Sequence, residues 1–190
     1  MDKKLTLWEI KKDNNKKEMI RAARNLFEKK GYHETSLREL CSAVGISKTS
    51  FFNYFGSKDE LIRIIFNSAL NDTREEAETK LGDDANPYEA VLFILNSMLT
   101  DAVAYPNVVS VAYEYMLGRD SFSELRDGYR ELISFYLAKA AEQGRLRDGI
   151  SEESALTILE GSFYALTFSK DFDGARRSIK EITALVLKED

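Results

Sequence analysis

The sequence predicts an all-α protein, with a three-helix helix-turn-helix head followed by a larger body of about six helices. Apolar residues recur at helical spacing along the chain, with no alternating strand pattern between them. Only two of the 190 residues are proline, which suits helices joined by short connections. The predicted domains are residues 1–56, which form the head and its basic N-terminal arm, and residues 57–190, which form the body.

The first helix is expected from about Asn15 to Lys30, with Gly31 as its C-cap. Residues 1–15 are polar and rich in lysine, apart from a few apolar residues that include Trp8. Three interpretations of this segment stay open. It is a flexible basic arm that strengthens contact with phosphate, an extra helical turn that packs Trp8 on the head, or a set of solubilising charges.

A helix-turn-helix pattern follows. Ser36 and Glu39 form a capping box that opens a short helix, and Gly45 stands where a tight turn needs a backbone conformation that glycine adopts freely. Ser47 then caps a second short helix. The apolar face of the first short helix consists of Leu37, Leu40, Cys41 and Val44, at positions i, i+3, i+4 and i+7.

The second short helix divides its residues between two faces. Phe51 and Phe55 are expected to point back onto the first short helix, while polar residues stay exposed. A helix, a glycine turn and a second capped helix with an exposed polar face form the layout with which proteins read the DNA major groove. The exposed polar residues are Lys48, Thr49, Ser50 and Asn53.

Ser57 and Glu60 form another capping box, which starts a helix that ends near Lys80 and is expected to link head and body. Asn86 followed by Pro87 opens the next helix. Later helices have similar signals, with Ser121, Ser151 and Asp173 at their expected starts. The predicted helices of the body after the linking helix are residues 87–104, 107–117, 121–143, 151–169 and 173–188.

Residues 14–62 resemble the DNA-binding head of the TetR (tetracycline-repressor-like) family of bacterial transcription regulators. The matching segments are Ile20–Phe27, Gly31-Tyr32, Thr35-Ser36, Gly45–Lys48 and Tyr54–Leu61. The resemblance implies nine helices, a DNA operator as partner, and a variable body that binds a small-molecule effector and forms a homodimer.

Ten residues are expected to contact DNA. Lys48 is the candidate donor to guanine, Asn53 suits adenine or a phosphate, and Thr49 offers a methyl and a hydroxyl to bases. Thr35, Ser36 and Arg38 lie where the N-terminus of a helix can bind phosphate. The resemblance implies phosphate contacts for Ser50, Tyr54 and Lys58.

Phe52 departs from the family pattern, because the family commonly has a tyrosine at this position, whose hydroxyl meets a phosphate. Phenylalanine cannot make that hydrogen bond. Two interpretations remain: Phe52 packs on a thymine methyl group, or it joins Phe51 and Phe55 in the core.

The charge distribution supports a nucleic-acid partner for the head. The net charge of the chain is −5, but residues 1–60 carry 13 basic and 9 acidic side chains, against 14 and 23 in the rest. No apolar run is long enough to span a membrane and no secretory signal opens the chain, so we expect a cytoplasmic protein without a membrane partner.

No metal or other cofactor is predicted. A single cysteine, Cys41, excludes an internal disulfide and a cysteine-cluster metal site, and we expect it to be a small buried apolar residue. The only histidine, His33, has no partners at metal-ligand spacing and is expected on the surface. Because no nucleophile–base pair or phosphate-binding glycine loop is present, the chain is not expected to be an enzyme.

The body is rich in aromatic residues and methionine, which favours an adaptable, mostly apolar effector pocket, although each such residue is also a candidate for the core. The candidate ligand-binding residues are Phe93, Asn96, Met98, Tyr113, Glu114, Arg126 and Tyr164.

Two copies of the last two helices are expected to form a four-helix bundle across a two-fold axis; the alternative is packing within one chain. The candidate interface residues are Leu156, Leu159, Gly161, Phe163, Ala165, Ile182 and Leu185.

These features predict a homodimeric repressor that a small, mostly apolar inducer releases from a pseudo-palindromic operator. An activator or a corepressor-dependent regulator would have the same sequence pattern. A structural DNA-binding protein without a ligand is a further alternative, against which the size of the body argues.

Overall fold

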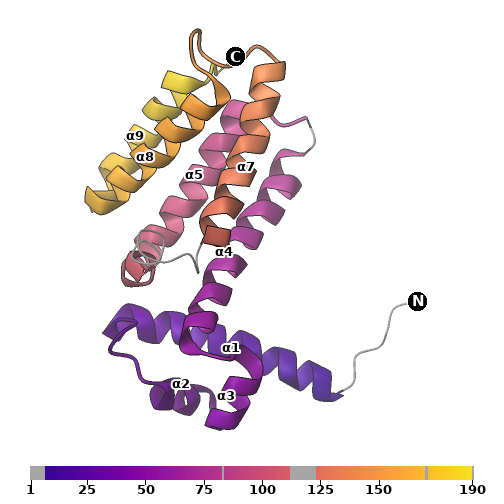
Figure 1. The fold of residues 1–190 in the computed structure, drawn as a ribbon, viewed down its shortest axis with the longest axis vertical. Helices are drawn as coiled ribbons and strands as arrows, with labels where there is room; N and C mark the ends of the chain where they lie inside the picture. Colours follow the sequence, from indigo (N-terminus) through magenta and orange to yellow (C-terminus); the bar gives the residue numbers. More distant parts are fainter. Residues whose placement is uncertain (1–6, 83, 112–122, 170, 190) are drawn as a thin grey trace. The chain divides into compact units, whose positions relative to one another are not determined.

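The computed structural model describes residues 7–82, 84–111, 123–169 and 171–189, and of residues 7–13, 123–126, 168 and 169 it describes the backbone only. The predicted all-α class is confirmed: these ranges contain helices, turns and a single isolated antiparallel bridge between Leu146 and Leu187. Figure 1 shows the helices in order along the chain. They are α1 (Leu7–Lys30), α2 (Leu37–Val44), α3 (Lys48–Phe55), α4 (Lys58–Leu81), α5 (Pro87–Ala104), α7 (Ser123–Glu142), α8 (Glu152–Ser169) and α9 (Phe172–Val186).

The chain divides into two compact units. The first unit comprises residues 1–68 and 105–118, and the second comprises residues 69–104 and 119–190. Helix α4 therefore begins in the first unit and ends in the second. Residues 106–111, which follow α5, are helical and belong to the first unit.

Helix α1 is longer than the sequence predicted, because it begins at Leu7 rather than near Asn15. This favours a helical extension over a flexible arm for the backbone of residues 7–14. The predicted C-cap is confirmed, since the Gly31 N–H donates to the Phe27 carbonyl at 2.8 Å.

The core of the first unit joins α1 to the short helices and to the start of α4. Two of the four apolar residues predicted to face inward from α2, Leu40 and Cys41, are buried, while Leu37 and Val44 are half-buried. The buried apolar side chains here include Met19, Ala23, Phe27, Tyr32, Leu40, Cys41, Phe51, Phe55, Leu61, Ile62 and Ile65.

The second unit is built around α5, which packs against α7, α8 and α9 (Figure 1). Tyr88, Ile94 and Leu99 of α5 are almost fully buried, so this helix supplies much of the core. Helices α4 and α7 approach closely where a Cβ on Gly128 would lie 2.4 Å from a methyl carbon of Leu70. Only glycine fits at that contact without movement of the neighbouring side chain.

Of the capping signals predicted after α4, two of the three within the described residues are confirmed. Asn86 accepts the Tyr88 N–H at 2.9 Å and Ser151 accepts the Ser154 N–H at 3.2 Å, as N-caps do. The prediction that Asp173 opens the last helix was wrong, because Asp171 is its N-cap and accepts the Gly174 N–H at 3.0 Å. Ser121 lies outside the described residues.

Among the helices that the structure describes, none combines the length and the hydropathy needed to cross a membrane.

Candidate nucleic-acid interface

The turn between α2 and α3 has the geometry expected of a helix-turn-helix. At the start of α2, the Ser36 hydroxyl accepts the Glu39 N–H at 3.2 Å, and the Ser36 N–H donates to the Glu39 carboxylate at 2.9 Å. The capping box is therefore complete. Gly45 ends α2 in the left-handed conformation, with φ of 69°, and Ser47 caps α3 by accepting the Ser50 N–H at 3.0 Å.

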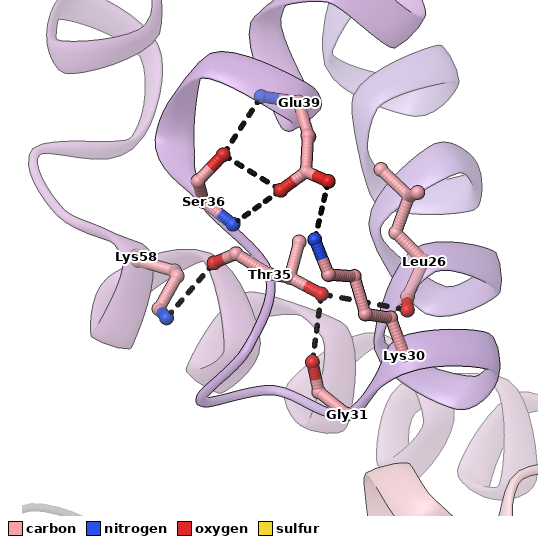
Figure 2. A network of polar contacts seen from close by, with 7 residues as sticks. All are labelled: Leu26, Lys30, Gly31, Thr35, Ser36, Glu39 and Lys58. Carbon is pink, nitrogen blue, oxygen red and sulfur yellow. Dashed lines mark hydrogen bonds and ion pairs between the residues drawn. The ribbon is translucent and has the colours of Figure 1, made fainter.

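A network of polar contacts ties the start of α2 to the end of α1 and the start of α4 (Figure 2). The Lys30 ammonium binds the Glu39 carboxylate at 2.5 Å. The Thr35 hydroxyl donates to the Gly31 carbonyl at 2.7 Å, and the Lys58 ammonium donates to the Thr35 carbonyl at 3.2 Å. These contacts fix the connection between α1 and α2, and so the position from which α3 is presented.

Two side chains of this network, Glu39 and Lys58, have pKa values below their ordinary ones. The Lys30 ammonium, followed by hydrogen bonds from Ser36, lowers the pKa of Glu39 to about 2. Glu39 is therefore a carboxylate at the N-terminus of α2 throughout the neutral range. The pKa of Lys58 is lowered chiefly by desolvation, which Asp59 and Glu34 partly oppose.

Helix α3 separates its aromatic residues onto two faces. Phe51 is fully buried and Phe55 is 3% exposed, as predicted, whereas Phe52 is 51% exposed. The interpretation of Phe52 as a core residue was wrong, because its ring stands outside the core, nearly perpendicular to the Phe51 ring and 5.8 Å from it between centroids. Contact of Phe52 with a base stays a prediction.

The remaining polar residues of α3 form what we call the reading face: Lys48, Thr49 and Asn53 are exposed, and Ser50 and Tyr54 are half-buried. Lys48 and Thr49 are the first two residues of α3, so their side chains stand in its first turn. This is the part of a recognition helix that reaches base edges.

The structure places two of the predicted phosphate-binding groups differently. The side chain of Thr35 is 1% exposed, and its N–H donates to the Tyr32 carbonyl at 3.2 Å, so neither group faces a surface that a phosphate can reach. The Ser36 hydroxyl and N–H are engaged with Glu39, whose negative charge opposes a second anion. Arg38 is exposed and is the member of this trio that fits a phosphate contact.

Lys58 also has a structural role. Its ammonium donates to the Tyr32 carbonyl at 2.9 Å as well as to the Thr35 carbonyl, and it lies 4.2 Å from the centroid of the Tyr32 ring. An ammonium has three N–H donors, so one remains for a phosphate. The Tyr32 hydroxyl in turn donates to the Asp59 carboxylate. No sequence pattern predicts this contact, because the two residues stand 27 positions apart.

His33 is exposed, as predicted, with its ring edge-on to that of Tyr32. Within the described ranges, no three histidine, cysteine or carboxylate side chains are grouped so that they could hold a metal ion. Cys41 is 5% exposed, and burial raises the pKa of its thiol.

The candidate ligand-binding residues of the body do not converge on one described cavity. Tyr113 and Glu114 lie outside the described residues, as does the side chain of Arg126. The Asn96 amide donates to the Leu92 carbonyl of its own helix at 2.8 Å, and Lys80 lies 5.2 Å from the centroid of the Phe93 ring. The four candidates with described side chains, which are all half-buried, are Phe93, Asn96, Met98 and Tyr164.

Two grooves in the second unit are lined by described residues. One, of about 420 Å³, lies between α4 and α7 and includes Arg74, Phe135 and Lys139 in its lining. The other, of about 460 Å³, lies beside α9 and the start of α5. None of the four candidates with described side chains lines either groove.

The candidate dimer residues divide into two groups. Leu156, Leu159 and Phe163 are 7%, 1% and 4% exposed, so they pack in the core of their own chain and offer little surface to a second copy. The others remain accessible: Gly161 and Ala165 on α8 and Leu185 on α9 are exposed, and Ile182 is half-buried.

A head of this geometry, with a capped and exposed reading helix, defines a helix-turn-helix DNA-binding protein. Residues 19–65 match the family model described as bacterial regulatory proteins of the tetR family. The chain is also similar to the HTH-type transcriptional repressor AcnR of Corynebacterium efficiens, with 24% identity over 188 residues that cover 93% of this chain and 95% of that protein.

Solved structures share the fold over most of the chain. A TetR transcription regulator from Haloarcula marismortui superimposes with a TM-score of 0.74 at 14% identity, over 93% of this chain and 100% of that chain. The transcriptional regulator FadR from Bacillus subtilis, solved in complex with stearoyl-CoA, gives a TM-score of 0.72 at 16% identity, over 88% of this chain and 96% of that chain. The family-model match at the head and the likeness of the whole chain to regulators of this family together support a transcriptional regulator of the TetR family.

Proposed function

We propose that the protein is a homodimeric repressor that binds a pseudo-palindromic operator and leaves it when a small, mostly apolar inducer binds the body. The observation that carries the proposal is the reading face of α3, whose polar first turn is exposed while Phe51 holds the helix in the core of the head. As a regulator of transcription, it would act in the cytoplasm, on double-stranded DNA.

In this proposal the reading face enters the major groove. Lys48 donates to the acceptors of a guanine, while Thr49 and Asn53 contact neighbouring bases or phosphates. Arg38, Ser50, Tyr54 and the remaining donor of Lys58 hold the sugar–phosphate backbone on either side. Phe52, which is exposed beside them, packs on a thymine methyl group.

A second copy is needed to read both half-sites. Gly161 and Ala165 stand one turn apart on the exposed side of α8 and leave room for another helix to approach closely, while Leu185, 68% exposed, offers an apolar contact on α9. Two α8–α9 pairs packed around a two-fold axis give a four-helix bundle and a dimer with two heads. The heads must then stand about 34–36 Å apart, one turn of DNA.

Release of DNA requires a ligand that binds one arrangement of the heads better than the other. Helix α4 belongs to both compact units, so a change in its direction would move the head when the body rearranges. The crystal structure of FadR is of a complex with stearoyl-CoA, which supports a ligand with a long apolar chain for this protein as well. In this scheme residues 1–56 read DNA, and residues 57–190 bind the ligand and form the dimer.

Selection of DNA from a random pool, at near-physiological salt, tests the proposal. We expect an inverted repeat, and we expect Lys48→Ala to lose or alter the preferred base at one position of each half-site. Lys80→Ala, which removes an exposed lysine from the second unit, serves as the control and should leave the preference unchanged. Featureless, salt-sensitive enrichment would instead support a structural DNA-binding protein.

The dimer is tested separately by sedimentation. Leu185→Glu places a charge on the proposed interface and should convert dimer to monomer without unfolding the chain. Val103→Glu, on α5, changes another exposed apolar residue and should leave the dimer intact. A wild-type monomer at micromolar concentration would contradict the two-headed model.

Addition of a ligand to the operator complex distinguishes two kinds of regulator. A repressor dissociates from the operator, whereas a corepressor-dependent regulator binds it more tightly.

A further inference from the structure

The groove beside α9 and the start of α5 has an unusual lining. Three of its side chains, Arg176, Arg177 and Lys180, are cations that stand within two turns of α9. Glu181 and Glu189 also line it. The five charges leave one net positive charge, so a single anionic group would neutralise the groove.

Tyr88 is the buried member of the same lining. Its side chain is only 1% exposed, and its hydroxyl makes no hydrogen bond with the described part of the chain. Enclosing a hydroxyl without a partner is unfavourable, so an unsatisfied one beside a groove points to an acceptor that arrives with a ligand. Burial, reinforced by Glu189 and Glu89, raises the pKa of Tyr88, so the hydroxyl keeps its proton and remains a donor.

One of the cations in the groove is held only loosely. Lys180 and Glu189 approach each other at 3.9 Å, and both side chains are more than half exposed, at 63% and 58%. Exposed pairs of this kind contribute little to stability, so an incoming anion can replace the Glu189 carboxylate at Lys180.

We propose that this groove binds a small molecule through a phosphate or carboxylate group, which ion-pairs with Arg176, Arg177 and Lys180 and accepts a hydrogen bond from the Tyr88 hydroxyl. Guanidinium groups suit both anions, because their N–H donors form a planar fork. Leu185, proposed for the dimer, does not line this groove. The inference therefore describes a second ligand site and does not depend on the proposed repressor mechanism.

The test is a calorimetric titration of the full-length protein with inorganic phosphate and, in a second arm, with acetate, at constant ionic strength maintained with chloride. We expect saturable binding of at least one of the two anions, and the tighter one identifies the chemical group. Tyr88→Phe keeps the ring and removes the hydroxyl; it should raise the dissociation constant about tenfold, the effect of losing one hydrogen bond to a charged group. Arg177→Gln should weaken binding similarly.

Two comparisons keep the test specific to this groove. Arg74→Gln removes a cation from the other groove and should leave the affinity unchanged. Without anion, Tyr88→Phe should melt at the same temperature as the wild type or higher, because the hydroxyl it removes has no partner. Equal affinity of the wild type and Tyr88→Phe, or the absence of saturable binding of either anion, would overturn the proposal.

Discussion

The two short helices of the head confine their buried apolar residues to one face, whereas the last two helices of the body carry apolar residues on several faces. In the head, α2 and α3 have eight residues each, and successive aromatic residues separate cleanly: Phe51 is buried and Phe52 is half exposed. In the body, α8 and α9 have 18 and 15 residues, and apolar residues occur around most of α8.

This difference shows where function can be assigned from local signals. A helix of two turns is not stable alone, so caps and a few core contacts determine its ends and its inward face, and the remaining residues are available for DNA. A longer apolar helix supplies both the core of its own chain and an interface with another. Periodicity alone does not distinguish the two uses: it predicted both Leu159 and Leu185 for the interface, yet Leu159 is buried within its own chain and Leu185 is 68% exposed.

The largest expected effect tests the separation of faces in the head. Phe51→Ala should destabilise the protein by about 3–5 kcal/mol, because it removes a fully buried ring and leaves a cavity. Phe52→Ala, its neighbour, should change the free energy of unfolding by less than about 0.5 kcal/mol. Urea denaturation followed by circular dichroism measures both. Similar losses in the two variants would mean that α3 is not held as the structure shows.

The matching test in the body compares Leu159→Ala with Leu185→Ala. Leu159 is 1% exposed within a single chain, so its truncation should cost about 2–5 kcal/mol at any protein concentration. The effect of Leu185→Ala should instead depend on protein concentration, because its proposed partners belong to a second copy. Denaturation at two well-separated concentrations distinguishes these cases. A concentration-independent loss for Leu185 would place its contacts within its own chain.

Most of the fold could be predicted because its signals are local. The capping serines at positions 36, 47 and 151 and the Asn86-Pro87 pair each start a helix in the structure. The errors lie where such signals compete or are weak. The sequence before Asn15 is polar enough to resemble an arm, yet α1 extends back to Leu7, and Asp171 rather than Asp173 caps α9.

The candidate site could be predicted only in part, because exposure depends on contacts between distant residues. The reading face of α3 follows from periodicity. The inward position of Thr35 does not follow from periodicity, because it depends on the hydrogen bond of its hydroxyl to the Gly31 carbonyl. The hydrogen bonds of Lys58 to the Tyr32 and Thr35 carbonyls do not follow from it either. Likewise, the groove at Tyr88 joins residues some 90 positions apart, a distance at which sequence pattern carries no information.

A smaller effect tests the caps that the head depends on. Ser36→Ala should lower the free energy of unfolding by about 1 kcal/mol, because the Glu39 N–H loses its acceptor. Ser42→Ala changes an exposed serine inside α2 and should be neutral or slightly stabilising, since alanine is the better helix former. Denaturation of both variants beside the wild type measures the difference. Equal stability of Ser36→Ala and Ser42→Ala would show that the capping box does not position α2.

The smallest expected effect is the pH dependence that Glu39 contributes. Its pKa in the folded protein, about 2, is below the ordinary value of 4.5, so the unfolded chain binds the proton more tightly. The stabilisation is therefore complete above about pH 4.5 and disappears as the pH falls toward 2. Glu39→Gln lacks this titration, so the stability gap between wild type and variant should narrow across that window. It should also narrow at high salt, because the pair with Lys30 is exposed. A gap that stays constant with pH would mean that the carboxylate is not bound to Lys30 and Ser36 in solution, and that the N-terminus of α2 is open to a DNA phosphate after all.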